Sequence, residues 1–217
     1  MNFLSHAIAY LDRPYVVAGT AVPDWLSVVD RRIRVRSRQA VPLLHSDDPI
    51  TRDVALGITQ HHRDDQWFHS SRLFNETALR LAVQLRDQLP GDEGFRPSFV
   101  GHILIEILID ASLITRDPQI ATRYYAAIDA VSAEAVEAVV NRVSQSCTQD
   151  LAPLILRFAS ARFLYDYLDN DKLLMRLNQV MARVGLPVLP PELIPWLAET
   201  RQVIDLYCDD LLNPNAP

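Results

Sequence analysis

The sequence predicts an all-α, single-domain protein, and three observations support this. Strand signals are scarce, whereas apolar residues recur at helical spacing along most of the 217 residues. Prolines and short clusters of Asp, Asn or Ser separate these stretches, as they do where helices begin. With 49% apolar and 22% charged residues, a chain of this length buries a substantial core. We therefore predict one helical domain over residues 1–217.

The elements follow one another with short connections. Pro49 comes directly after Ser46, Asp47 and Asp48, a pattern typical of a helix start. Ser132 precedes an apolar periodic stretch and is a candidate N-cap. The composition of residues 89–97 and 185–192 predicts loops. The predicted helices lie near residues 2–11, 14–29, 50–69, 71–89, 97–116, 118–131, 133–146, 149–168, 170–184 and 191–212.

Bulk composition excludes several classes of protein. A net charge of −6 does not favour a nucleic-acid duplex as partner. The apolar N-terminus lacks the basic start of a signal peptide, and His6 interrupts it. No uninterrupted apolar run reaches the length that spans a membrane. The two cysteines give neither a disulfide framework nor a zinc-binding spacing. We expect a cytoplasmic protein that does not enter a membrane.

Residues 31–38, RRIRVRSR, form a basic segment in an otherwise acidic chain. Five arginines in eight residues leave the remainder at −11 (−6 minus 5). The alternation of arginine with Ile33 and Val35 is compatible with a short extended segment. The segment is either a solvated loop that balances charge or a site for an anion or an acidic partner, because guanidinium groups pair well with phosphate and carboxylate.

The stretch GHILIEILID, residues 101–110, is an apolar helix that carries ionisable side chains. His102, Glu106 and Asp110 are spaced by four residues and therefore lie on one side of the helix. A buried ionised carboxylate costs several kcal/mol, roughly, unless another group compensates it. A bound cation or a matched polar network would explain this stripe.

A second stripe lies in GITQHHRDDQWFHSS, residues 57–71. His61, Asp65 and His69 share one helical face, whereas His62 and Asp64 are expected to point to another. Imidazole and carboxylate at this spacing suit divalent transition metals such as manganese, iron or zinc. The expected cofactor is a divalent metal, with manganese first and iron, magnesium or zinc as alternatives. Alone, the stripe is equally compatible with a polar surface.

Asp24 is a third element. It lies in AVPDWL, where the neighbouring Pro23 also makes it a candidate for the start of a helix.

These segments together carry a family resemblance. The chain begins MNFLSH, continues with GTAVPDW at 19–25, then with GI at 57–58 leading to His61 and Asp65, and then with the helix of His102 and Glu106. In this order the segments resemble the acyl carrier protein phosphodiesterase family, whose members are related to the all-α HD-type metal-dependent phosphohydrolases. The resemblance covers residues 1–110 and implies an HD-like helical bundle. His69 and His102 stand where the family usually has Asp.

The resemblance implies hydrolysis of the phosphodiester that joins 4′-phosphopantetheine to acyl carrier protein. His61 and Asp65 would bind the metal, and Asp24, His102 and Glu106 would complete or orient its ligands. His6 and His69 would support the ligands or transfer protons. Asp110 has no counterpart in the family and is a catalytic candidate only through its place in the stripe of His102 and Glu106. The arginines that could hold the phosphate or the acidic carrier protein are Arg63, Arg31, Arg32 and Arg34.

Two other functions remain open. An HD-like phosphohydrolase could act on a nucleotide or another small phosphate ester. Alternatively, the chain could be a helical binding or scaffold protein whose polar residues form a buried network without catalysis.

Overall fold

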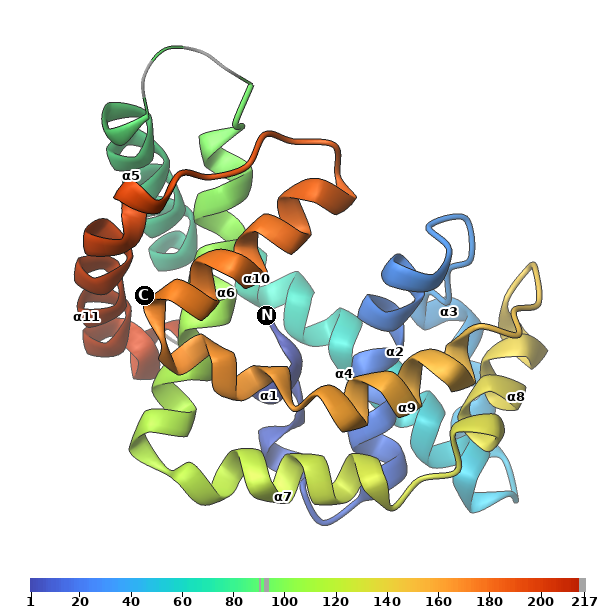
Figure 1. Cartoon of the computed structure of the whole chain (residues 1–217). Helices are drawn as coiled ribbons and strands as arrows, with labels where there is room; N and C mark the ends of the chain where they lie inside the picture. Colours follow the sequence, from blue (N-terminus) through green and yellow to red (C-terminus); the bar gives the residue numbers. More distant parts are fainter. Residues whose placement is uncertain (90, 92–93, 215–217) are drawn as a thin grey trace. The chain divides into compact units, whose positions relative to one another are not determined.

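The computed structural model describes residues 1–89, 91 and 94–214, and every regular element in this part of the chain is helical (Figure 1). The prediction of an all-α, multi-helix fold is confirmed. Contacts between Cα atoms divide the chain into two compact units. Unit 1 contains Met1, residues 3–66 and 118–162, and unit 2 contains Asn2, residues 67–117 and 163–217. One domain over 1–217 stays a prediction.

Unit 1 is built around one apolar helix, α2 (Pro14–Val29), which packs against α1, α7, α8 and α9 (Figure 1). Most of its residues from Val16 to Leu26 are buried. The remaining elements of unit 1 are α1 (Phe3–Ala7), η1 (Ile8–Tyr10), α3 (Ser37–Ala40), η2 (Val41–His45), most of α4 (Pro49–Ser70), α7 (Pro118–Asp129), α8 (Ala133–Val143) and α9 (Leu151–Ala161).

Unit 2 is built around α6 (Pro97–Arg116), which packs against α5, α11 and η3. Figure 1 shows α5, α6 and α11 side by side. The last turn of α4 belongs to this unit, because the boundary after Gln66 falls within that helix. Its other elements are α5 (Arg72–Gln88), η3 (Phe163–Leu168), α10 (Asn170–Arg183), η4 (Pro191–Leu193) and α11 (Ile194–Leu211).

The helix-start signals in the sequence are confirmed. Ser132 Oγ accepts a hydrogen bond from the backbone N–H of Ala135 (3.1 Å). At the start of α4, Asp48 Oδ2 accepts one from the N–H of Thr51 (3.0 Å). Both side chains satisfy N–H groups that the first turn of a helix leaves without partners.

Three segments differ from the prediction. The first helix ends at Ala7 and continues as a 3-10 turn, and the helix predicted over 149–168 begins at Leu151 and breaks at Arg162. Arg162 has a φ of +47°, and its guanidinium lies over the Tyr125 ring (4.6 Å) and pairs with Asp129 (2.5 Å), contacts that hold the chain in this turn. The third segment is 37–45, where short helices form although none was predicted. Residues 31–36 form a turn and an irregular stretch, and the backbone of Arg36 is extended.

The two predicted loops have different outcomes. Residues 186–190 have no regular structure, which confirms most of the second loop, although η4 begins at Pro191. In the first loop, Gly91 and Gly94 have φ values of +70° and +77°. Residues 90, 92 and 93 of that loop lie outside the described residues.

By length and composition α6 could cross a membrane, but most of it is buried inside the protein. Its stripe of His102, Glu106 and Asp110 also interrupts the apolar surface. A core helix passes the same test, so the finding does not favour a membrane protein. The cytoplasmic location stays a prediction.

Two glycines allow α2 and α4 to touch through their backbones. A Cβ atom added to Gly57 would lie 2.2 Å from the Val16 carbonyl oxygen and 2.6 Å from the Thr20 nitrogen. One added to Gly19 would lie 2.4 Å from the Val54 carbonyl oxygen. No residue with a side chain fits at either position unless the helices move apart. This crossing brings the middle of α4 against Thr20.

We expect the Gly57→Ala variant to be less stable than the wild type by about 1–3 kcal/mol, the usual cost of overpacking a core. The measurement is the free energy of unfolding from urea titration followed by circular dichroism. Gly101→Ala in α6 is the matched control, because both substitutions gain about 1 kcal/mol of helix propensity. The Cβ at position 101 would meet its nearest atom at 3.1 Å, compared with 2.2 Å at position 57. Equal stabilities of the two variants would contradict the role assigned to the crossing.

Candidate metal centres

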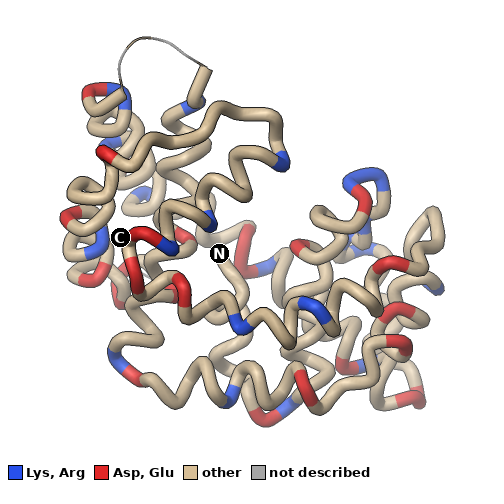
Figure 2. The backbone as a smooth tube through the Cα atoms, in the orientation of Figure 1, with Lys and Arg blue, Asp and Glu red and all other residues tan. Residues whose placement is uncertain are grey.

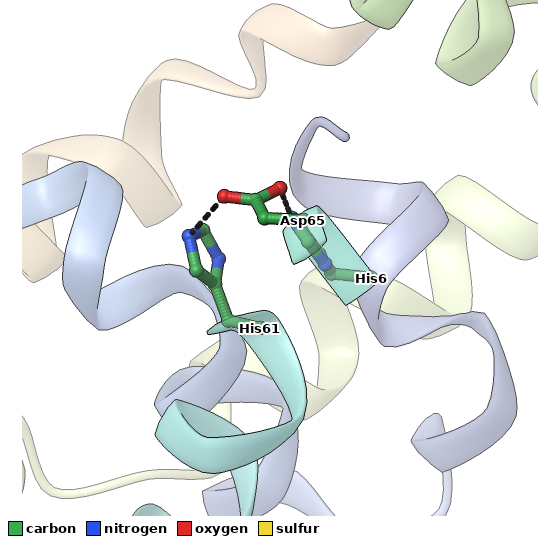
Figure 3. A group of neighbouring side chains, drawn as sticks. All are labelled: His6, His61 and Asp65. Atoms are coloured by element: carbon green, nitrogen blue, oxygen red, sulfur yellow. Dashed lines mark ion pairs between the residues drawn. The ribbon is translucent and has the colours of Figure 1, made fainter. Parts of the chain in front are cut away.

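The first candidate centre lies in unit 1 and consists of His6, His61 and Asp65, which we call the His61 group (Figure 3). One potential ligand atom from each residue lies within 4.8 Å of the other two. His6 comes from α1, whereas His61 and Asp65 are four residues apart on α4. The helical spacing seen in the sequence therefore brings together two of the three members.

The α2–α4 crossing fixes the ring of His61. Its Nδ1 lies 2.9 Å from the carbonyl oxygen of Thr20, which can only accept, so Nδ1 carries the proton. Its Nε2 faces Asp65 Oδ2 at 3.2 Å. A backbone carbonyl that holds one ring nitrogen leaves the other free to bind a metal, as in many histidine ligands.

His6 faces a carboxylate with each ring nitrogen. Nδ1 lies 3.1 Å from Asp64 Oδ2, and Nε2 lies 3.4 Å from Asp65 Oδ1. The Nε2 atom is buried and makes no hydrogen bond within the part of the chain described. The ring stacks on that of His61, with centroids 4.2 Å apart. A buried nitrogen in this situation calls for either a proton or a metal ion.

Positive charge already lies beside Asp65. The α-amino group of Met1 donates a hydrogen bond to Asp65 Oδ1 (2.9 Å). Burial alone would raise the pKa of Asp65, but its close pairing with His6 and His61 and the Met1 charge hold that pKa far below its usual range. Burial lowers the pKa of His6, but the hydrogen bond to Asp64 and the charge of the nearby Asp65 carboxylate outweigh this and raise the pKa to about 9.

The spacing of the His61 group also suits a metal ion. An ion with bonds of about 2.1 Å holds neighbouring ligand atoms about 3.0–3.4 Å apart. His61 Nε2 lies 3.2 Å from Asp65 Oδ2 and His6 Nε2 lies 3.4 Å from Asp65 Oδ1, so both distances fall within this range for an ion that both carboxylate oxygens bind. Two imidazoles and one carboxylate form a donor set typical of Mn²⁺, Fe²⁺ or Zn²⁺. The residues present therefore fit such an ion.

The second candidate centre lies in unit 2 and consists of His69, His102 and Glu106, which we call the His102 group. The Nε2 atoms of both histidines face the same oxygen, Glu106 Oε1, at 2.9 and 3.1 Å. Burial alone would raise the pKa of Glu106, but nearby positive charge, followed by the hydrogen bonds from His102 and His69, holds that pKa well below its usual range. Each group is described by itself, because each lies within one unit.

The predicted ligands are thus distributed over two groups. His61 and Asp65 lie with His6, whereas His102 and Glu106 lie with His69. Among the described residues, Asp24 and Asp110 belong to neither group. Asp24 lies inside α2, so the alternative that it starts a helix is wrong. Asp110 is fully buried on α6. We predicted that these ligands share one ion, and this stays a prediction. The roles of Asp24 and Asp110 also stay predictions.

The arginines proposed for phosphate binding are exposed. Arg63 lies on α4, and Figure 2 shows the basic segment in the connection between α2 and α3. Arg32 is already engaged by Asp30 (Nη2–Oδ2 2.8 Å). The alternating Ile33 and Val35 are buried, which anchors the segment and turns the arginines outward. Their substrate-binding role stays a prediction.

Sequence reasoning missed two neighbours of the His61 group. Asp64, expected on another face, is buried and faces His6. His62 Nε2 donates a hydrogen bond to the carbonyl oxygen of Val35 (2.8 Å), which ties the basic segment to the helix that carries His61. Burial lowers the pKa of His62, which favours its neutral form. The apolar residues inside the arginine run were the only signal of this anchoring.

Comparison of the chain with models of protein families, with curated proteins and with solved structures gives no match. The resemblance to the acyl carrier protein phosphodiesterases therefore stays a prediction that depends on the motifs of residues 1–110.

The raised pKa of His6 predicts how the metal-free protein responds to pH. A proton on His6 stabilises the fold, and this contribution is complete below pH 6.5 and is lost as the pH rises through about 9. We expect the thermal midpoint of metal-free protein to fall over this window and NMR titration of the His6 ring to show the raised pKa. Asp64→Asn should lower that pKa. A His6 pKa at its ordinary value would contradict the geometry.

Proposed function

We propose that this protein is a metal-dependent phosphodiester hydrolase whose centre is the His61 group. The observation that carries the proposal is the convergence of two buried imidazoles on one ionised carboxylate, with His6 Nε2 buried and without a hydrogen bond. Such a donor set binds transition metals, and the order of the sequence motifs around it resembles that of known phosphodiesterases.

Each residue has a definite task in this proposal. His6, His61 and Asp65 would hold the ion, with Thr20 O orienting His61 and Asp64 orienting His6. When bound, a divalent ion activates water and offsets charge on the phosphate oxygens. Because Asp64 keeps a proton on His6 Nδ1, an ion that displaces the proton of Nε2 would find the lone pair of that nitrogen on the side of Asp65.

We propose the phosphodiester between 4′-phosphopantetheine and acyl carrier protein as the substrate. The exposed arginines of residues 31–38 support an acidic partner, because their loop is fastened to α4 next to His61. A nucleotide or other small phosphate ester would use the same centre but would need no such surface.

One observation favours the non-catalytic alternative. The polar atoms of the His61 group also satisfy one another, since His6 and the Met1 amine balance the charges of Asp64 and Asp65 without an added ion. A buried network of this kind can specify a core by itself. Metal binding separates the two functions, because the network predicts none.

We expect Asp65→Asn and His61→Gln to lose bound metal and to reduce hydrolysis of a generic phosphodiester by more than about 100-fold, because even outer partners of metal ligands contribute about 10–100-fold. Metal analysis of protein purified without chelator and initial rates with Mn²⁺ are the measurements. His45→Gln is the matched control, since His45 is exposed at the end of η2. Full activity of both centre variants would rule the centre out.

The substrate prediction has its own test. With holo-acyl carrier protein, the Arg34→Glu/Arg36→Glu double variant should show a raised KM and an unchanged kcat, because rim charges act on association. With a small phosphodiester the same variant should behave like the wild type. An equal effect on both substrates, or activity on nucleotides alone, would exclude the carrier protein as substrate.

A further inference from the structure

The last turn of α4 and the middle of α6 place three potential ligands on one point in unit 2. His102 and Glu106 are four residues apart on α6, and His69 lies in the last turn of α4. Both Nε2 atoms approach a single oxygen, Glu106 Oε1, at 2.9 and 3.1 Å. These distances are close to the separation of about 3.0–3.4 Å between neighbouring ligands of an ion with bonds of about 2.1 Å.

Aromatic packing holds both rings in place. The buried ring of Phe74 contacts His69 (centroids 5.2 Å apart) and His102 (4.9 Å), and Phe68 packs against Phe74 (4.6 Å). The Asn75 side chain donates a hydrogen bond to the carbonyl oxygen of His69 (2.9 Å), which fixes the backbone where α4 ends. The ligand atoms are therefore positioned before any ion binds, which lowers the entropic cost of binding.

The exposure of these side chains leaves one side open. Glu106 is only 13% exposed, whereas His69 and His102 are 34% and 37% exposed. Within the described residues no protein atom bonds their Nδ1 atoms. In the Nδ1–H tautomer each of these atoms can therefore donate a hydrogen bond to water, and the Nε2 lone pair is available to an ion. A change of tautomer on both rings would convert the hydrogen-bonded group into a set of three ligands.

We infer that His69, His102 and Glu106 form a second metal site, which binds a divalent transition ion separately from the His61 group. Two nitrogens and one carboxylate oxygen select Zn²⁺, Co²⁺, Fe²⁺ or Mn²⁺ over Mg²⁺ and Ca²⁺, which prefer oxygen. Three protein ligands leave at least one position for water or an anion. The inference does not depend on catalysis at the His61 group.

The test is the number of ions bound per chain, measured by calorimetry with Zn²⁺ and by the visible absorption of bound Co²⁺. The wild type should bind two ions. Glu106→Gln and His102→Gln should each weaken one of them by more than about 100-fold and spare the other, since even outer partners contribute about 10–100-fold. His61→Gln should show the converse loss. Glu76→Gln, exposed on α5, is the matched control in unit 2.

The outcomes separate this inference from the proposed function. If Glu106→Gln loses one ion and His61→Gln loses none, the result supports the site at the His102 group and contradicts the proposed centre at the His61 group. If His61→Gln loses one ion and the variants of the His102 group lose none, the second site is overturned and the proposed centre is retained. The second site is also overturned if Glu106→Gln and His102→Gln still bind two ions, or if every variant loses both ions.

A measurement on the wild type does not depend on how the variants fold. Nitrogen NMR of the histidine rings should show Zn²⁺ shifting the Nε2 signals of His69 and His102. Unchanged signals at saturating Zn²⁺ would overturn the site.

Discussion

The crossing of α2 and α4 at Gly19 and Gly57 determines where the side chains of the His61 group lie. Because no side chain separates the two backbones there, the helices approach closely enough for the ring of His61 to reach the Thr20 carbonyl oxygen at 2.9 Å. One turn further along α4, Asp65 is carried to the same side. A larger residue at either glycine would move this whole stretch of α4 relative to α2 and break the contact that fixes the His61 tautomer.

The His61 group shows how buried charge is tolerated in this fold. Asp64 and Asp65 are adjacent carboxylates, and each faces a nitrogen of the same imidazole. Their combined charge keeps His6 protonated to an unusually high pH in the absence of a metal, which the raised pKa of about 9 expresses. A metal ion must therefore displace a proton, so its affinity rises with pH. The carboxylates that attract a metal ion thus also stabilise the proton on His6 that competes with it.

Helices were the part of the structure best predicted from the sequence, because their apolar periodicity and capping residues are local. The ends of α2 and α6, for example, agree with the predicted ranges 14–29 and 97–116. The helix break at Arg162 was missed, because it depends on contacts with Tyr125 and Asp129, which are distant in the sequence. The short helices over 37–45 follow a basic run that gave no periodic signal.

The candidate sites divide along the same line. The i,i+4 pairs, His61 with Asp65 and His102 with Glu106, could be predicted because a single helix creates them. Which histidine joins each pair could not, since that depends on how different helices pack. The spacing predicted that His69 shares a stripe with His61 and Asp65. His69 is eight residues beyond His61, however, and therefore lies about 12 Å further along the axis of α4, at 1.5 Å per residue. At that distance it meets Glu106 instead, and His6 from α1 takes the third place beside His61.

Histidine at positions 69 and 102 changes what the His102 group can bind. Two aspartates there would surround Glu106 with further negative charge, a set of oxygen ligands suited to Mg²⁺ or Ca²⁺. Of two imidazoles, one neutralises the carboxylate when it is protonated, and both offer nitrogen ligands when they are neutral. Phe74, packed against both rings, supports either state because it contributes no charge. The group can therefore remain folded without a metal and still present a preformed set of ligands to a transition ion, a combination that two aspartates could not provide.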